Sequence, residues 1–380
     1  MSVSDTMRIV FVLPSAGGGG GAHSIVQEAA GLARLGVDVA IASPEHLAVD
    51  FRLRYAELQG RGVANPTYAS IAGLSTILSG ADLVVATTAL SVDVVVEACE
   101  AVEPAERPKL GYYVQDYEPL FYSPGSDEWI KATRSFEQAG IGLIFAKTDW
   151  LRNIVEANHG VLVRRVQASI DHETYYPVHR PDEQPIRVTA MVRPQTARRA
   201  PRRTLRILER IAFTYPDAHV SFFGCDGRDL DAFNLQPSNA LGCHGVLTQA
   251  QVATLLRHSD LFLDLSDYQA FGRTGLEGMA CGCVPILPIF GGTEEYAEHL
   301  VNGFLVDTRS DEEIMLAVAA FLDGGSAQRA LMRTAGIETA LRYSVSRSAF
   351  SEYRLFRDYL GPATSHDIVE DSETRLPAAS

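Results

Sequence analysis

The feature that most constrains the fold is the succession of patterns in residues 7–42. Residues 7–13 form a nearly continuous apolar run, which is typical of a strand buried on both faces. Five glycines follow at 17–21, and then a helical pattern that stops at Gly36. Residues 37–42 complete the unit as a second strand. Because the crossover from a strand through a helix to a parallel strand is right-handed, this βαβ unit predicts the start of a parallel sheet.

The rest of the chain repeats this alternation on both sides of a proline-rich segment at 177–185, which we interpret as a linker. We expect an α/β protein in which two Rossmann-like, doubly wound domains face each other across a cleft. The expected parts are an N-terminal domain at 1–178, a C-terminal domain at 179–345, a helix at 346–362 that packs back towards the N-terminal domain, and a disordered tail at 363–380. The further expected strands are 83–86, 110–114, 142–146, 165–168, 187–191, 219–223, 239–243, 261–263, 284–287 and 303–306.

The composition limits the class of protein. At 380 residues, of which 46% are apolar, the chain can bury two cores, and its net charge of −14 argues against a general nucleic-acid binder. The cysteines are scattered without a Cys-x-x-Cys pair, which is typical of a reducing compartment. No apolar run reaches the roughly 18 residues needed to span a bilayer. We expect a cytoplasmic protein, with peripheral contact at the inner membrane as the alternative.

The stretch at 264–282 carries the most chemical information. Its pattern predicts the end of a buried strand, a loop with Gly272 and Gly275, and a short helix. Unpaired N–H groups at the start of such a helix suit an anion, typically a phosphate. Glu277 in the first turn has a carboxylate that can accept hydrogen bonds from a ribose diol. The alternative is a capping box, because Thr274 and Glu277 have the Ser/Thr-x-x-Glu spacing.

Arginines follow the first expected strand of the C-terminal domain. Arg193 lies at the carboxyl end of residues 187–191, so we expect it to face the cleft. Arg198 and Arg199 lie in the loop after this strand. Guanidinium groups bind pyrophosphate with bidentate geometry, so this segment predicts an anion site. The further arginines at 202–210 have helical spacing, and we expect them on a solvated face.

The N-terminal domain offers two candidate ligand segments. The glycine run at 17–21 is a weak dinucleotide fingerprint, and we interpret it as a mobile loop whose backbone can close on a ligand. His23 either donates to a substrate oxygen or is a polar residue at a helix start. Residues 112–122 form the densest aromatic patch, with an amide and two carboxylates at 115–118. Such groups are typical of sugar binding, and the alternative is a packed corner between domains.

Asp229 and Asp231 resemble the Asp-x-Asp pair that binds a metal ion in some sugar transferases. They come after a turn that contains glycines, on an expected surface loop. We therefore interpret them as solvated, and we predict no metal site and no cofactor.

Together these segments resemble the retaining GT-B glycosyltransferases of family 4 over residues 7–360. The motifs that carry the resemblance are the glycine loop at 17–21, SIDHETYYP at 169–177, Arg193 with Arg198, and FGRTGLEGMACG at 271–282. Within that family, residues 113–122 and 193–199 are most similar to the bacterial rhamnosyltransferases that build surface glycans.

The resemblance implies a nucleoside diphosphate sugar as donor and a glycan or lipid-linked acceptor, without a metal ion. The residues it implies in catalysis are Arg193, Arg198, Glu277, Gln269 and Asp116. The donor would be bound by Gly18, Gly19, Gly20, Arg199, Gly224, Phe271, Gly272, Arg273, Thr274 and Gly275. The acceptor would be bound by His23, Gln115, Tyr117 and Glu118.

Two positions depart from the family pattern. Gln269 stands where the family often has the first Glu of a Glu-x7-Glu pair, and Gln115 stands where it often has His. Glutamine keeps hydrogen bonding to sugar hydroxyls but removes a charge near the reacting centre. A catalytically silent subunit that binds a nucleotide-sugar is therefore the second hypothesis. A nicotinamide-dependent oxidoreductase is the third, because the glycine run lacks a well-placed acidic partner for a ribose.

Overall fold

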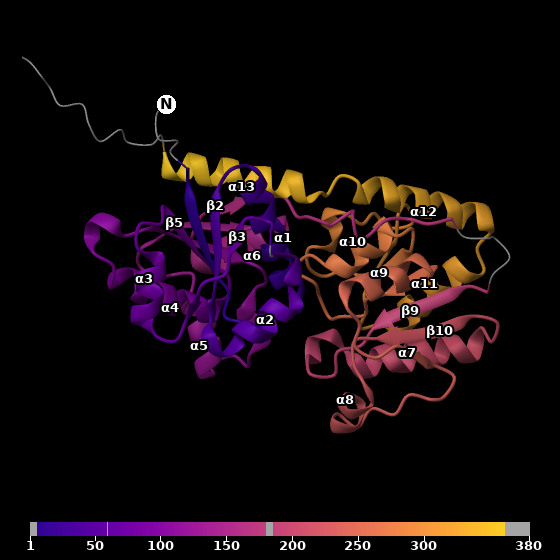
Figure 1. Ribbon diagram of the computed structural model, residues 1–380. Helices are drawn as coiled ribbons and strands as arrows, with labels where there is room; N and C mark the ends of the chain where they lie inside the picture. The colour runs from indigo at the N-terminus through magenta and orange to yellow at the C-terminus, as the bar shows by residue number, and fades with distance from the viewer. Residues whose placement is uncertain (1–5, 59, 180–184, 362–380) are drawn as a thin grey trace, which may run out of the picture.

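The computed structural model describes residues 6–58, 60–179 and 185–361. The middle of the expected linker at 180–184 and the expected tail at 363–380 lie outside these residues. Two α/β domains stand next to each other along the long axis of the molecule (Figure 1). Each contains its own parallel sheet with helices, so the predicted pair of Rossmann-like domains is confirmed.

The N-terminal sheet has the strand order β3-β2-β1-β5-β6-β7-β8, with β4 paired to β2, and the paired strands run parallel. Both faces of β1 are buried, because Ile9 and Phe11 enter one core and Val10 and Val12 enter the other. The strands are β1 (Arg8–Val12), β2 (Asp38–Pro44), β3 (Val63–Ala64), β4 (Thr67–Tyr68), β5 (Leu83–Ala86), β6 (Lys109–Val114), β7 (Ile141–Ala146) and β8 (Val163–Arg165).

Helices connect these strands and cover the sheet. They are α1 (Gly20–Arg34), α2 (Ala48–Arg54), α3 (Ile71–Leu78), α4 (Ala89–Glu100), α5 (Asp127–Arg134) and α6 (Asp149–His159). Short 3-10 turns are η1 (Glu45–Leu47), η2 (Ala56–Leu58), η3 (Pro104–Glu106) and η4 (Glu118–Phe121). Because α1 already begins at Gly20, the glycine run is divided between a turn and the first residues of a helix.

The C-terminal sheet has the order β11-β10-β9-β12-β13-β14 and is also parallel. Its strands are β9 (Arg187–Met191), β10 (His219–Phe223), β11 (Gly242–Cys243), β12 (Leu261–Leu263), β13 (Val284–Pro288) and β14 (Phe304–Val306). Its helices are α7 (Pro201–Thr214), α8 (Gly227–Ala232), α9 (Gln249–Arg257), α10 (Arg273–Ala280), α11 (Asp311–Leu322) and α12 (Ser326–Ala340), with η5 (Ala197–Arg199) and η6 (Thr293–Glu295).

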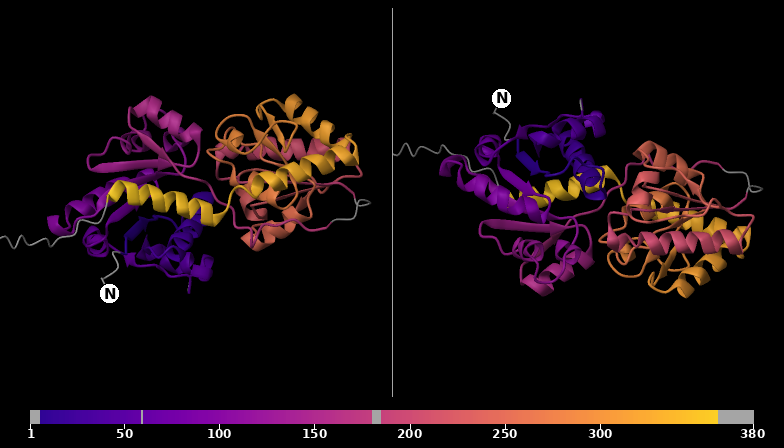
Figure 2. Two further views of the ribbon diagram at one scale, coloured as in Figure 1. Left: turned by 90° about the horizontal axis from the view of Figure 1, so that it is seen from above. Right: turned by 90° about the horizontal axis from the view of Figure 1, so that it is seen from below.

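The last described helix, α13 (Val345–Leu360), leaves the C-terminal domain and lies along the N-terminal domain (Figures 1 and 2). It packs against α1 at a close approach, since a Cβ at Gly31 would lie 2.6 Å from the Cβ of Ala349. Lys109 Nζ donates to the carbonyls of Tyr359 and Leu360 at 3.2 Å. The chain therefore crosses between the domains at two places, near residue 169 and near residue 344, and Ile170 pairs with Ser344 there.

Several expected boundaries are wrong. The strand expected at 165–168 is β8 (Val163–Arg165), and only two residues of the segment expected at 239–243 pair as β11.

The arginines at 202–210 are not all solvated, because Arg203 donates to the Leu265 carbonyl and to Asp267, each at 2.7 Å. Among the described residues, the helices are all too short or too polar to cross a membrane.

Candidate active site

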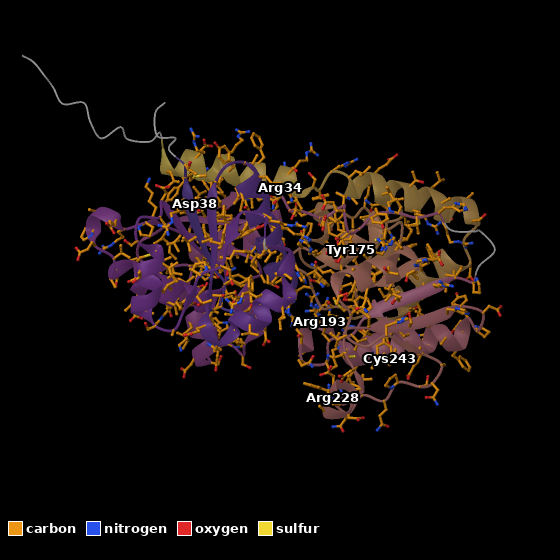
Figure 3. The ribbon with its side chains drawn as sticks, in the orientation of Figure 1. Arg34, Asp38, Tyr175, Arg193, Arg228 and Cys243 are labelled. Carbon is orange, nitrogen blue, oxygen red and sulfur yellow. The ribbon has the colours of Figure 1, made fainter. Side chains whose placement is uncertain are left out.

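The carboxyl ends of the strands in both sheets point towards the space between the domains, where a cavity of about 1000 Å³ opens. Its N-terminal wall includes Gly18, Gly20 and His23, at the turn after β1. Its C-terminal wall includes Arg193 and Glu277. Figure 3 shows Arg193 at the boundary between the domains. Residues far apart in the sequence are thus brought to one cavity.

Arg193 lies two residues beyond β9, as the sequence predicts. Among the residues that the structure describes, its guanidinium makes no ion pair. Burial lowers the pKa of Arg193, although Asp264 opposes the shift. A partly desolvated cation without a paired carboxylate favours the binding of an anion.

Arg198 and Asp116 pair with each other across the two domains. The Arg198 Nη2 atom lies 3.0 Å from Asp116 Oδ2, and the guanidinium lies 4.4 Å from the centre of the Phe121 ring. Burial raises the pKa of Asp116, and Arg198 opposes that shift. Neither residue contributes to the wall of the 1000 Å³ cavity as the described residues form it. Their predicted roles as phosphate ligand and hydroxyl orienter would require this ion pair to open.

Arg199 and Gln269 both turn towards Asp264 inside the C-terminal domain. Arg199 Nη1 lies 3.8 Å from Asp264 Oδ2 and 3.4 Å from Ser266 Oγ. The Gln269 amide donates to Asp264 and, at 3.3 Å, to Ser266 Oγ. Both side chains therefore interact with residues of the C-terminal domain. A contact of Gln269 with a donor sugar stays a prediction.

Arg273 bridges the domains. Its Nε donates to Glu277 Oε1 at 2.7 Å, and its two terminal nitrogens donate to Ser24 Oγ and Gln27 Oε1 of α1. Arg273 lines the cavity, and three of its five N–H donors already bind protein oxygens, so its role as a donor ligand stays a prediction. The alternative capping box is also wrong, since α10 begins after Gly272 without a side-chain cap.

Glu277 is buried at the cavity wall beside Arg273 and Tyr175. Burial raises the pKa of Glu277, whereas the Arg273 guanidinium lowers it. Tyr175 of the SIDHETYYP segment lines the same wall (Figure 3). An ionised Glu277 next to a cavity can still accept a hydrogen bond from a hydroxyl group, because a carboxylate offers about four acceptor sites.

The loop before α10 is held rigidly. Gly272 has φ of +78°, and its carbonyl accepts a hydrogen bond of 2.7 Å from Tyr296 Oη. Phe271 packs edge-on against the ring of Tyr296. Gly272, Phe271 and Gly275 thus shape the loop, while Thr274 reaches the cavity. Gly224, with φ of +104°, also lies on the cavity wall.

His23 is held as a neutral ring at the N-terminal wall. The Gly18 N–H donates to Tyr55 Oη at 3.1 Å, and this oxygen lies 2.9 Å from His23 Nδ1. Burial lowers the pKa of His23 to about 3, and Arg273 and Arg193 add to the shift. A neutral imidazole can donate one hydrogen bond and accept one, so His23 remains a candidate ligand for a substrate oxygen.

Two of the expected acceptor ligands are part of the N-terminal core, and the structure corrects that expectation. Tyr117 is buried, and its Oη lies 3.1 Å from His159 Nε2. Glu118 accepts a 2.9 Å hydrogen bond from Ala89 N at the start of α4, and burial raises its pKa to about 7. The packed-corner alternative describes these two residues. Gln115 instead lies next to the glycine turn, 3.4 Å from the position of a Cβ on Gly21.

Asp229 belongs to a helix, which corrects the expected solvated loop. It forms a capping box with Asp226 at the start of α8. Its Oδ1 accepts a 2.7 Å hydrogen bond from Gln195 Nε2. The local spacing that resembles Asp-x-Asp is explained by helix capping.

Comparison with known proteins identifies the class. Residues 202–338 match the family of Glycosyl transferases group 1. HepE (Alr3699) of Anabaena, solved with UDP and glucose, is 16% identical with a TM-score of 0.72 and 93% of this chain and 100% of that chain covered. A glycosyltransferase of Rickettsia africae is 15% identical with a TM-score of 0.72, and 94% and 99% are covered. Sucrose-phosphate synthase of Thermosynechococcus elongatus is 13% identical with a TM-score of 0.71, and 93% and 98% are covered.

None of the curated proteins matches the sequence. The matched segment and the shared architecture nevertheless agree: residues 202–338 match a glycosyl transferase domain, and the chain has the GT-B fold.

Sequence reasoning missed Tyr175, Tyr55 and Arg54 at the cavity. Tyr175 lies within SIDHETYYP at 169–177, and its place in this motif is the sequence feature that could have indicated a cavity residue. The other two come from α2 and the residue after it, where no local pattern distinguishes a cavity residue from an exposed one.

Proposed function

We propose that this protein is a retaining, metal-independent glycosyltransferase of family 4 that uses a nucleoside diphosphate sugar. The observation that carries the proposal is Arg193, a partly buried cation at the wall of the cavity beside Thr274 at the start of α10. A diphosphate placed there would meet the guanidinium and the N–H groups of the helix start. HepE, which shares the fold, was solved with UDP-glucose, and this supports a nucleotide-sugar as donor.

The arrangement suggests how the chain would assist the reaction. Negative charge builds on the phosphate oxygen as the bond to the sugar breaks, and fixed positive groups stabilise that charge most in the transition state. Arg193 and the α10 start supply such groups without a metal ion. Glu277 would accept hydrogen bonds from the ribose. Retention would require the acceptor hydroxyl to attack from the face that the phosphate leaves, as the family resemblance implies.

We propose a hexose as the transferred sugar, with rhamnose as the first candidate, and a glycan or lipid-linked acceptor in bacterial surface polysaccharide synthesis. The support is the similarity of residues 113–122 and 193–199 to the rhamnosyltransferases of that group. The two segments contact each other through the ion pair of Arg198 and Asp116.

The test is turnover of nucleotide-sugars by the purified protein. Donor hydrolysis or transfer is expected with one of the UDP-, dTDP- or GDP-sugars in the presence of EDTA, and Glu277→Ala should reduce it at least tenfold. Arg210→Ala, at an exposed position of α7, serves as the control. Loss of activity in EDTA that added Mg²⁺ restores would contradict the metal-independent mechanism.

A silent nucleotide-sugar-binding subunit is the second candidate. It is favoured by Gln269, whose amide is engaged by Asp264 and Ser266. Binding of a nucleotide-sugar without hydrolysis or transfer in the same assay would support this second candidate and reject the first.

A further inference from the structure

Two arginines of the cavity wall, Arg54 and Arg61, come from the N-terminal domain. Arg54, the last residue of α2, lines the cavity next to the glycine turn. A Cβ at Gly18 would clash with Arg54 Nη1, so the guanidinium lies directly on the backbone of that turn. Among the described residues, the side chain of Arg54 forms neither an ion pair nor a hydrogen bond. It is an unengaged cation at a turn that faces the cleft.

The charges around the glycine turn converge on one place. Arg273, Arg193 and Arg54 line the same cavity as His23, and each of them lowers the pKa of that ring. Three of the five N–H donors of Arg273 bind Glu277, Ser24 and Gln27. Arg54 and Arg193 are left as cations without carboxylate partners in the described part of the chain, and they come from opposite domains.

The acidic residues of the cavity do not neutralise this pair. Glu277 is occupied by Arg273, and Asp171 accepts hydrogen bonds from Glu173 N and Thr174 Oγ1. Asp50 lies one turn before Arg54 on α2 but forms no ion pair with it in the described residues. The cavity wall carries four arginines, Arg54, Arg61, Arg193 and Arg273, against three carboxylates, so it has a positive balance within a chain whose net charge is −14.

We infer that Arg54 is a ligand of the donor's diphosphate, so that the phosphates are bound by one arginine from each domain. The inference rests on the proposed function, because it takes a nucleoside diphosphate as the occupant of the cavity. A diphosphate carries several negative charges, and guanidinium groups on two sides can each bind it with two hydrogen bonds. The donor would then hold the two domains together, with Arg54 beside the Gly18 turn on one side of the phosphates and Arg193 on the other.

The test compares nucleoside diphosphates with monophosphates, because Arg54 should contribute to the additional phosphate. Calorimetry would give the dissociation constants of UDP, dTDP and GDP and of UMP, dTMP and GMP for wild-type, Arg54→Ala, Arg54→Lys and Arg52→Ala proteins. Arg52 is the matched control, since it lies on the same helix, is exposed and is absent from the cavity wall that the described residues form. For the nucleotide that binds best, Arg54→Ala should lower the preference for diphosphate over monophosphate about tenfold. Arg54→Lys should give an intermediate loss, and Arg52→Ala should leave the ratio unchanged.

Equal ratios in wild-type and Arg54→Ala proteins would overturn the inference while leaving the proposed function intact. Equal losses in Arg54→Ala and Arg52→Ala would also overturn it, because they would indicate general electrostatic attraction rather than a ligand. If the wild-type protein binds none of the nucleoside diphosphates, the proposed function itself fails. Melting temperatures without ligand check that the variants are folded. If Arg54→Ala is not folded, Arg54→Lys is compared with the wild-type protein instead.

Discussion

The two glycine turns that meet at the cleft differ in their surroundings. In the C-terminal domain, a Cβ at Gly275 would lie 2.6 Å from Leu287 Cδ2, and one at Gly272 would lie 2.9 Å from Thr293 Cγ2. In the N-terminal domain, a Cβ at Gly19 would have no atom of the described residues within 4 Å, and one at Gly20 would meet only Arg273 Cδ at 4.0 Å. The C-terminal turn is therefore fixed by packing. The N-terminal turn is tight at Gly17 and Gly18, where a Cβ would clash with Tyr55 and Arg54, and has room to adjust at Gly19 and Gly20.

This difference suits a site that binds the donor on a rigid domain and then closes over it. Preformed groups stabilise a charged transition state best when they need no rearrangement. The fixed groups, Arg193 and the start of α10, belong to the packed wall. Gly19 and Gly20, where a Cβ would find open space, belong to the adjustable wall. Substitutions on each wall can test whether the two differ in this way.

The largest effect is expected at the fixed wall. Arg193→Ala should lower kcat/KM for the donor by about 100-fold, because it removes charge-assisted hydrogen bonds to the diphosphate. Steady-state kinetics measure the change, with Arg210→Ala as the control at an exposed site of the same domain. A loss below about threefold would place the fixed positive charge elsewhere.

The two domains also hold their buried carboxylates differently. Glu277 has Arg273 beside it, whereas Glu118 has a backbone N–H, and burial raises the pKa of Glu118 from 4.5 to about 7. A carboxyl group whose pKa is raised by folding binds its proton more tightly in the folded state. Glu118 therefore contributes its full stabilisation below pH 4.5 and loses it as pH rises through about 7.

Glu118→Gln should remove this pH dependence. Between pH 4.5 and 7 the free energy of unfolding of the wild-type protein should fall relative to that of the variant, by about 3 kcal/mol at most. The pKa of His23, lowered from 6.5 to about 3, acts in the opposite direction, since its contribution is lost as pH falls. The contribution of His23 is the same in the wild-type and Glu118→Gln proteins. The difference between their free energies of unfolding, measured by urea denaturation, therefore reports the contribution of Glu118 alone. Parallel pH profiles would show that the Glu118 carboxyl group titrates normally.

Gly275→Ala tests the packing of the fixed wall. The added methyl would lie 2.6 Å from Leu287 Cδ2 and 2.7 Å from Tyr296 Oη, so we expect overpacking to cost about 1–3 kcal/mol of the free energy of unfolding. Denaturant titration measures it. Unchanged stability together with unchanged donor affinity would show that this wall also has room to adjust.

Gly19→Ala is the matched substitution in the adjustable wall and should have the smallest effect. Gly19 has φ of −92°, which any residue adopts, and open space surrounds the site of its Cβ. We expect the free energy of unfolding to change by less than about 0.5 kcal/mol. A loss as large as that of Gly275→Ala in the same titration would erase the difference between the two turns.

The features that could be predicted from the sequence depend on the order of strands and helices. Arg193, Glu277 and both glycine turns reach the cleft because each comes after the carboxyl end of a parallel strand. Whether a residue near a strand end faces the cleft or the core depends on its side-chain direction, and a one-residue difference reverses it. Tyr117 and Glu118, which we expected at the cleft, are both buried in the core, because the chain turns into η4 after β6 and strand alternation no longer applies there.

Contacts between distant segments could not be predicted from local patterns. Arg273 binds Gln27, 246 residues away, and this contact decides that its charge is engaged. Arg198 binds Asp116 of the other domain. The sequence identifies each arginine as a possible anion ligand. Whether its guanidinium is free to bind an anion depends on its partner in the other domain.

The central claim is that the cavity binds a nucleoside diphosphate through Arg193. The most direct measurement is the melting temperature of wild-type and Arg193→Ala proteins with saturating UDP, dTDP or GDP in EDTA. Ligand at about 100 times its dissociation constant should stabilise the folded protein by about 2.7 kcal/mol. We predict a rise in melting temperature with at least one of these diphosphates for the wild-type protein and little or none for Arg193→Ala. Equal rises in the two proteins, or no rise in the wild-type protein with any of the three, would contradict the account.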